Sequence, residues 1–202
     1  MKIGIYGGSF NPTHFGHIGL AKWVVENTDL DELWLMVSPN NPLKDKSILA
    51  DENERLEKAR EAIRREGDEA MRREGKRIVV SDFEFHLPRP TYTANTLRAL
   101  AREYPEHEFT LIIGEDNLHI FNQWREYQYI LDNYRVFVYP RREGDGAMRR
   151  EGDGAMRREG DEARRRWGEK AMGREGDKGM IYLAGAPYFD ISSTEIRKNL
   201  HK

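Results

Sequence analysis

The sequence predicts an α/β protein with a doubly wound parallel sheet. Short apolar runs typical of buried strands alternate with segments of helical periodicity along most of the 202 residues. A glycine-rich turn follows the first strand, and the other polar clusters also come directly after predicted strands. Because right-handed crossovers place most loops after strands at one edge of the sheet, these clusters are expected to meet there.

Six strands are predicted, at residues 2–6, 32–38, 77–81, 109–113, 135–139 and 179–183. Helical periodicity predicts helices near residues 18–25, 51–65, 94–103, 127–131 and 192–200. Thr93 is the expected N-cap of the third helix, and Ser192 with Glu195 has the form of a capping box at the last. Residues 83–90 are too rich in proline to be helical.

Composition limits the kind of protein. The chain is 38% hydrophobic and 34% charged, which suits one soluble domain, and it has no cysteine, so disulfides and thiolate metal sites are excluded. No apolar run is long enough to span a bilayer and no signal sequence opens the chain, so a cytoplasmic protein without membrane contact is expected. A net charge of −2 gives no general attraction to nucleic acid.

Two segments do not fit the α/β pattern. Residues 65–75 and 142–177 contain near-copies of an eight-residue unit, REGDGAMR, with glycines that weaken a helix by about 1 kcal/mol each. Charges of both signs alternate in them, as in a solvated polyampholyte. We interpret them as low-complexity surface insertions, or artificial replacements, in a single domain that spans residues 1–202.

Residues 7–17, GGSFNPTHFGH, form the first candidate site. Gly7 and Gly8 allow close approach of the backbone, and the start of the following helix presents N–H groups and positive potential to an anion. His14 and His17 are three residues apart and share a helix face, so both can donate to phosphate oxygens. A plain strand-to-helix turn is the simpler alternative. No P-loop lysine follows this strand.

Other polar residues come after later strands or at the last helix. Lys44 lies in a loop where it is either solvated or reaches a phosphate, and Asp116 is placed to accept hydrogen bonds from a ribose. Ser193, Thr194 and Arg197 would project from the start of the last helix. Two hydroxyls, free N–H groups and a guanidinium together suit a triphosphate better than a carboxylate.

Two motifs carry a family resemblance. GGSFNPTHFGH and, near the other end, ISSTEIR at residues 191–197 resemble the two signatures of the (H/T)xGH nucleotidyltransferases. With Asn11-Pro12 and His14, the first is most similar to nicotinate-nucleotide adenylyltransferases. The resemblance implies a Rossmann-like nucleotidyltransferase fold and transfer of AMP from ATP to nicotinate mononucleotide, which gives nicotinate adenine dinucleotide and pyrophosphate in NAD biosynthesis.

The resemblance also implies roles for individual residues. The catalytic residues would be His14, His17 and Arg197, which would contact the phosphates of ATP. The mononucleotide would meet Trp124, which stacks on its pyridine ring, the backbone of Arg125, and the PTYT string with Tyr92 and Thr93. The expected ATP-binding residues are Gly8, Ser9, Phe10, Lys44, Gly114, Asp116, Ile191, Ser193 and Thr194.

The implied chemistry needs no covalent intermediate and no general base, because the mononucleotide phosphate is itself the nucleophile. Mg²⁺ is expected to bind through the ATP phosphates and water, with no metal ligand from the protein. The alternatives are nicotinamide mononucleotide or phosphopantetheine as acceptor, and an engineered nucleotide-binding scaffold without turnover. The repeats and the short C-terminus predict impaired turnover. The sequence leaves open whether the protein forms a homo-oligomer.

Overall fold

One parallel sheet organises the protein. The computed structural model describes residues 1–39, 50–66, 75–140, 179–183 and 185–187. Within these ranges six strands pair in the order β3-β2-β1-β4-β5-β6, all parallel. The predicted doubly wound sheet is therefore confirmed. The strands are β1 (Lys2–Gly8), β2 (Glu32–Val37), β3 (Arg77–Ser81), β4 (Glu108–Gly114), β5 (Arg135–Tyr139) and β6 (Gly179–Tyr182).

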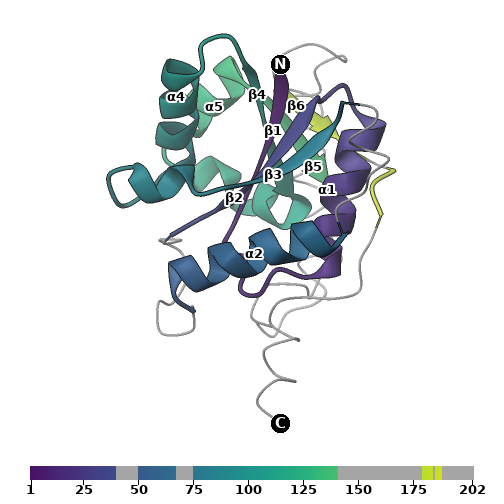
Figure 1. Ribbon diagram of the computed structural model, residues 1–202. Coiled ribbons are helices and arrows are strands. Elements are labelled where there is room, and N and C mark those ends of the chain that lie inside the picture. The colour runs from purple at the N-terminus through teal and green to yellow at the C-terminus, as the bar shows by residue number, and fades with distance from the viewer. Residues whose placement is uncertain (40–49, 67–74, 141–178, 184, 188–202) are drawn as a thin grey trace, which may run out of the picture.

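Helices cover both faces of the sheet (Figure 1). One face packs against α1 (Phe15–Asn27) and α2 (Glu52–Glu66), and the other against α4 (Thr93–Glu103) and α5 (Tyr127–Asn133). Two 3₁₀ helices, η2 (Phe83–His86) and η3 (Glu115–Gln123), follow β3 and β4. Among the described residues no helix is both long enough and apolar enough to cross a membrane.

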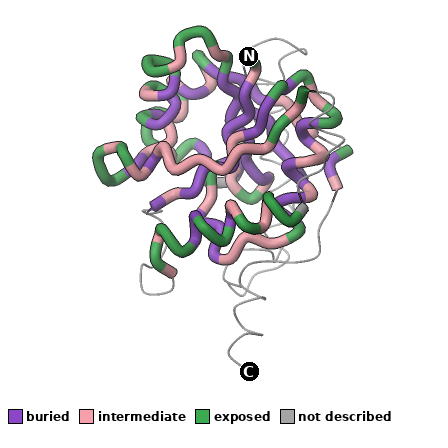
Figure 2. The backbone as a smooth tube through the Cα atoms, in the orientation of Figure 1, coloured by how far each residue is buried: buried purple, intermediate pink, exposed green. Residues whose placement is uncertain are grey.

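The core is split into two layers by the alternation of side chains along each strand. In β5, Phe137 and Tyr139 pack toward α1, whereas Val136 and Val138 pack toward α5. The central strands are accordingly buried along their length, and the exposed residues lie on the outer sides of the helices (Figure 2). Burial on both faces explains why these strands read as continuous apolar runs in the sequence.

Two local predictions are wrong. Residues 83–86 form the 3₁₀ helix η2, although residues 83–90 were expected to be non-helical. Proline restricts the residue directly before it, and η2 ends at His86, ahead of the residue that precedes Pro88. Thr93 is not an N-cap: Tyr92 occupies that position in extended geometry, and Thr93 is the first residue of α4.

Several predictions lie outside the described residues. These include the helix at 192–200 and nearly all of the two repeat segments, of which Arg65 and Glu66 belong to the end of α2. The single-domain interpretation of residues 1–202 stays a prediction. The described strands and helices nevertheless fix which loops come together at the carboxyl edge of the sheet.

Candidate active site

The site lies where the order of the strands reverses. From β1 the chain builds outward through β2 and β3, and then returns to place β4 on the other side of β1. Ligands of open parallel sheets bind in the crevice beyond such a pair of neighbouring strands. The two strands end at Gly8 and Gly114, the residues from which the two predicted ATP-binding segments start.

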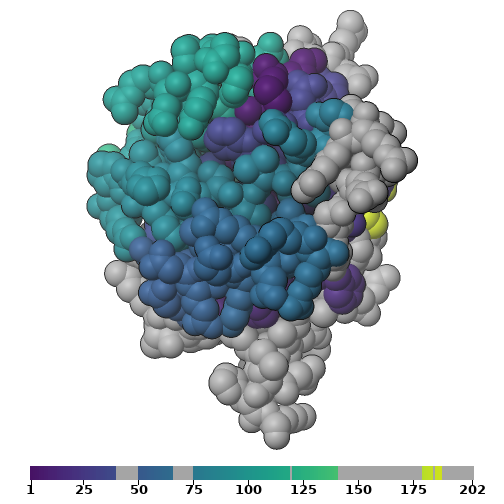
Figure 3. Space-filling model, viewed as in Figure 1, coloured from purple at the N-terminus to yellow at the C-terminus, as the bar shows by residue number. Residues whose placement is uncertain are grey.

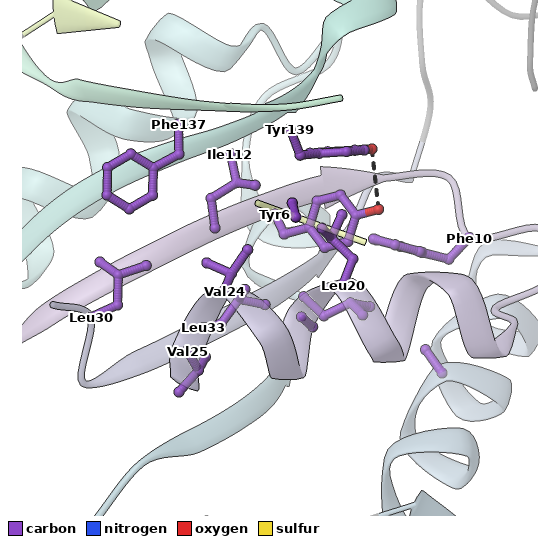
Figure 4. Close-up of a cluster of buried hydrophobic side chains, with 14 of the residues drawn as sticks. Tyr6, Phe10, Leu20, Val24, Val25, Leu30, Leu33, Ile112, Phe137 and Tyr139 are labelled. Carbon is purple, nitrogen blue, oxygen red and sulfur yellow. Dashed lines mark hydrogen bonds between the residues drawn. The ribbon is translucent and has the colours of Figure 1, made fainter. Parts of the chain in front are cut away.

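Residues 9–14, called here the phosphate turn, leave β1 and enter α1. Phe10 adopts a left-handed backbone (φ 43°), and its ring packs edge-on against Tyr6 with 5.5 Å between centroids (Figure 4). A Cβ on Gly8 would lie 3.0 Å from this ring, whereas nothing lies within 4 Å of a Cβ on Gly7. A side chain on Gly8 would thus crowd the Phe10 ring. Because Phe10 is 3% exposed, any contact from it to ATP must come from its backbone.

The two histidines of the turn meet at the start of α1. His14 is the N-cap residue, His17 lies one turn on, and their ring centroids are 3.7 Å apart. The backbone N–H of His14 donates to His17 Nδ1 at 3.3 Å. With Nδ1 accepting, the proton of the neutral His17 ring is on Nε2, which can donate to a ligand oxygen. The prediction that the histidines share a face is confirmed.

The end of β4 brings Gly114 and Asp116 together. A Cβ on Gly114 would collide with Asp116 Oδ1 and lie 3.1 Å from the Tyr139 hydroxyl, so only glycine fits here without a shift. The Tyr139 hydroxyl also lies 3.3 Å from that of Tyr6 (Figure 4). The ends of β1, β4 and β5 are therefore in contact beneath the phosphate turn.

The residues expected to bind the mononucleotide also converge. The Arg125 guanidinium lies over the Tyr92 ring, 5.0 Å from its centroid. Trp124 is the C-cap residue that follows η3, and its ring centroid is 5.1 Å from that of Phe121. Its indole N–H is buried without an acceptor among the described residues. The N-cap residue of α4, Tyr92, makes no side-chain capping bond, and the first N–H groups of a helix lack partners within it. Aromatic side chains and the N-terminus of α4 therefore lie in one region.

Two buried charged residues at this edge were not predicted as site residues. Arg55 of α2 is 1% exposed and donates to the carbonyl oxygens of Ser9, Ser38 and Pro39 at 2.6, 2.8 and 3.0 Å. Burial lowers the pKa of Arg55 from its ordinary value, yet an arginine stays protonated. Its charge therefore lies directly behind the phosphate turn.

Glu84 of η2 is the second missed residue. It accepts hydrogen bonds from the Thr96 hydroxyl at 2.8 Å and from the Ser38 hydroxyl. Burial raises the pKa of Glu84 above its ordinary value of 4.5, and the hydrogen bonds counter part of that effect. Helical spacing was the one sequence signal for Arg55, four residues before the core residue Ala59. No signal marked Glu84.

The remaining predicted residues are not placed. Lys44, Ile191, Ser193, Thr194 and Arg197 all lie outside the described residues. Within the described ranges no three His, Asp or Glu side chains group in a way that could hold a metal ion. The described part of the candidate site thus consists of the phosphate turn, the end of β4, and the residues expected to bind the mononucleotide, called here the mononucleotide region (Tyr92, Thr93, Trp124 and Arg125).

Comparisons with known proteins agree on one family. The model of the cytidylyltransferase-like family matches residues 5–199. A protein of Flavobacterium psychrophilum described as a probable nicotinate-nucleotide adenylyltransferase is 44% identical over 200 residues, which cover 99% of this chain and 86% of that protein. A protein of Flavobacterium johnsoniae with the same description is 46% identical over 141 residues, 70% of this chain and 68% of the relative.

A solved structure shares the fold. Nicotinic acid mononucleotide adenylyltransferase of Plasmodium falciparum, complexed with NaAD, aligns with a TM-score of 0.65 over 98% of this chain and 82% of its own. Its sequence is only 19% identical, so the likeness supports the Rossmann-like nucleotidyltransferase fold. The family follows from the sequence relatives.

Proposed function

Because the chain belongs to the nicotinate-nucleotide adenylyltransferases of the cytidylyltransferase-like family, we propose that it transfers AMP from ATP to nicotinate mononucleotide. The products are nicotinate adenine dinucleotide and pyrophosphate, in NAD biosynthesis. The observation that carries the proposal is the close pair of His14 and His17 rings at the start of α1, directly beyond the reversal of strand order. The match to residues 5–199 lends no support to the expected impairment of turnover.

The chemistry is a single in-line displacement. An oxygen of the mononucleotide phosphate attacks the α-phosphorus of ATP, a new P–O bond forms, and the bond to the bridging oxygen breaks as pyrophosphate leaves. The attacking phosphate is already ionised near neutral pH, so no side chain has to remove a proton. What the protein must supply is position and stabilisation of the negative charge that grows on the phosphoryl oxygens.

The described residues suit these two tasks. With Nδ1 of His17 accepting from the backbone of His14, the Nε2–H of His17 would donate to a phosphoryl oxygen, with the His14 ring beside it. Gly114 and Asp116 would line the adenosine, where a larger residue than glycine would displace the Asp116 carboxylate. Both segments leave the neighbouring strands β1 and β4, so the nucleotide would lie across the crevice between them.

The mononucleotide would lie on the α4 side. Trp124 would stack on the pyridine ring, with the backbone of Arg125 beside it. The first turn of α4, at Tyr92 and Thr93, would receive the nicotinate carboxylate. This last contact is what separates nicotinate from nicotinamide in our proposal, since an uncharged amide gains little from a helix N-terminus.

Residues outside the described ranges complete the proposal through their motifs alone. Ser193, Thr194 and Arg197 would hold the departing β- and γ-phosphates, with Ile191 and Lys44 as further ATP contacts. Mg²⁺ would be held by the phosphate oxygens and water and would neutralise part of their charge. An acidic cage is not required for such binding.

One assay tests the function. Pyrophosphate release from ATP and Mg²⁺ is measured with nicotinate mononucleotide, nicotinamide mononucleotide or phosphopantetheine as acceptor. We expect the highest kcat/KM with nicotinate mononucleotide. A higher value with either other acceptor would overturn the proposed specificity, and ATP binding without pyrophosphate release from any mixture would show a scaffold without turnover.

A further inference from the structure

Arg55 and Glu84 are held by neutral groups. Both are buried, at 1% and 7% exposure, and neither forms an ion pair with another described residue. Taking a charge out of water destabilises a fold unless hydrogen bonds compensate, and an apolar pair is often as stable. The arrangement therefore calls for an explanation other than stability.

Arg55 joins two loops at the carboxyl edge. Its Nη1 donates to the carbonyl oxygen of Ser9 in the phosphate turn at 2.6 Å and to that of Ser38, just after β2, at 2.8 Å. Its Nη2 donates to the carbonyl oxygen of Pro39 at 3.0 Å. A planar guanidinium with fixed donors sets the distance between these backbone segments.

Glu84 continues the connection from the same residue. Its carboxylate accepts from the hydroxyl of Ser38 and, at 2.8 Å, from the hydroxyl of Thr96 in α4. Thr96 is in turn tied to the start of its helix, because its N–H donates to the Tyr92 carbonyl at 3.0 Å, and its hydroxyl oxygen lies 3.3 Å from the same carbonyl. Tyr92 is the residue that contacts Arg125 in the mononucleotide region.

Ion pairs hold the helix that carries Arg55 against the segment that carries Glu84. α2 lies beside the segment that follows β3 (Figure 3), and two ion pairs connect them. Arg60 lies 3.2 Å from Asp82, and Arg89 lies 2.6 Å from Glu52. Ser38 is the junction between α2 and this segment, since its carbonyl accepts from Arg55 and its hydroxyl donates to Glu84.

We propose that the hydrogen-bonded chain Ser9–Arg55–Ser38–Glu84–Thr96, called here the relay, sets the position of the mononucleotide site relative to the phosphate turn. The inference rests on the proposed function. The members of the relay are positioning residues, because each acts through a backbone segment that binds a substrate. An in-line displacement needs the attacking oxygen and the α-phosphorus about 3–3.5 Å apart, and a shift of about 1 Å can lower the rate about 100-fold. Breaking the relay should therefore affect the reaction of the two bound substrates more than the binding of either.

The central test is Ser38→Ala, with binding and turnover measured separately. We expect kcat to fall about tenfold, while the dissociation constants of ATP and nicotinate mononucleotide, each measured alone by calorimetry, stay within twofold of wild type. Ser38→Thr keeps the hydroxyl and should recover most of the loss. A kcat within twofold of wild type in Ser38→Ala would overturn the relay, as would weaker mononucleotide binding at unchanged kcat.

A matched control separates positioning from general destabilisation. Thr110 in β4 is 1% exposed, and its hydroxyl has no partner among the described residues. Thr110→Val removes a buried hydroxyl far from the relay, and kcat should be unchanged. An equal loss of kcat in Thr110→Val would show that any buried hydroxyl has this effect, and it would overturn the proposal.

Hydrogen exchange tests the relay without relying on the proposed reaction. In the unliganded protein, Ser38→Ala should speed amide exchange in residues 87–96 at least fivefold relative to Thr110→Val. Unchanged exchange would overturn the relay. If the wild-type protein releases no pyrophosphate with nicotinate mononucleotide, the proposed function fails while the relay is still decided by this exchange.

Discussion

Charged side chains have different kinds of partner at the two ends of the sheet. At the amino ends of the strands, acidic side chains are paired with basic ones: Asp29 lies 2.7 Å from Lys2 Nζ and 3.0 Å from Arg135 Nη1. Glu32 accepts from Arg77 Nε at 2.8 Å. At the carboxyl ends, Arg55 and Glu84 are satisfied by carbonyls and hydroxyls instead.

The difference reflects what each end does. Opposite charges cancel one another's field, so the paired side chains at the amino end exert little net electrostatic attraction on a ligand. At the carboxyl end, hydrogen bonds to carbonyls and hydroxyls hold backbone segments at fixed distances. One end of the fold therefore serves stability, and the other serves position for the site. The predictions below test this division by changing one end at a time.

The largest effect is expected for His17→Ala. Loss of one donor to developing charge commonly lowers turnover by about 10²–10³-fold. Since His17 lies in the first turn of α1, we expect the melting temperature to change little. Steady-state pyrophosphate release and a thermal melt measure both quantities.

His107 supplies the control for that experiment. It precedes β4 at the amino end of the sheet and stacks on Tyr104 with 5.9 Å between ring centroids. His107→Ala should leave kcat within twofold of wild type. A loss below threefold in His17→Ala would remove His17 from the catalytic role.

Trp124→Ala is expected to have the next largest effect. Stacking of a base on an aromatic side chain contributes about 1–3 kcal/mol, so nicotinate mononucleotide should bind about tenfold more weakly. ATP affinity should be unchanged because Trp124 belongs to the mononucleotide region. Calorimetric titration with each ligand measures this. Trp124→Phe should retain most of the affinity, and equal affinity in Trp124→Ala would contradict the stacking role.

These predictions depend on features that sequence predicted with unequal success. The strands at 77–81 and 135–139 were predicted with their observed bounds, because apolar runs flanked by polar residues mark buried strands directly. The phosphate turn was recognisable from its glycines and histidines. Its individual contacts were not, since the left-handed Phe10 gives Gly8 a packing role that spacing does not reveal.

The relay was beyond sequence reasoning for a physical reason. A charged residue is normally assigned to the surface, and the partners of Arg55 are backbone carbonyls, which every residue carries. Glu84 is bonded to residues 46 positions before it and 12 after it, so only the folded chain brings them together. Buried charges with neutral partners leave no trace in charge patterning.

The amino end provides the converse test. Asp29→Ala should lower the free energy of unfolding by about 1–2 kcal/mol, because Arg135, whose side chain is 10% exposed, loses its charged acceptor. kcat should stay within twofold of wild type. Chemical denaturation and the pyrophosphate assay measure the two effects. A loss of activity at unchanged stability would contradict the division between the two ends.

An exposed ion pair is the control for Asp29. Glu54 and Lys58 form an i,i+4 pair on α2 with both side chains more than half exposed. Glu54→Ala should change stability by at most about 0.5 kcal/mol. Equal losses in the two variants would mean that the pairs at the amino end act as ordinary surface pairs.

The smallest expected effect is a difference in the slope of stability with pH. Burial raises the pKa of Glu84, so between its ordinary value of 4.5 and the raised one the folded state binds more protons than the unfolded state. Stability contributed by the protonated carboxyl is then lost as pH rises through that interval. Glu84→Gln has no such titration, so the variant should gain stability relative to wild type as pH increases from 4.5.

Asp29 should behave in the opposite way. Burial acts to raise the pKa of Asp29, but hydrogen bonds and charges from Lys2 and Arg135 outweigh it and lower the pKa below 3.8. Its stabilisation is present above that value and is lost as pH falls through the lowered pKa. The free energy of unfolding is measured by urea denaturation as a function of pH for wild type, Glu84→Gln and Asp29→Ala. The difference from wild type should vary with pH above 4.5 for Glu84→Gln and below 3.8 for Asp29→Ala. A Glu84→Gln difference that does not vary with pH would mean that Glu84 titrates alike in the folded and unfolded chains, and the contrast between the two ends would then rest on geometry alone.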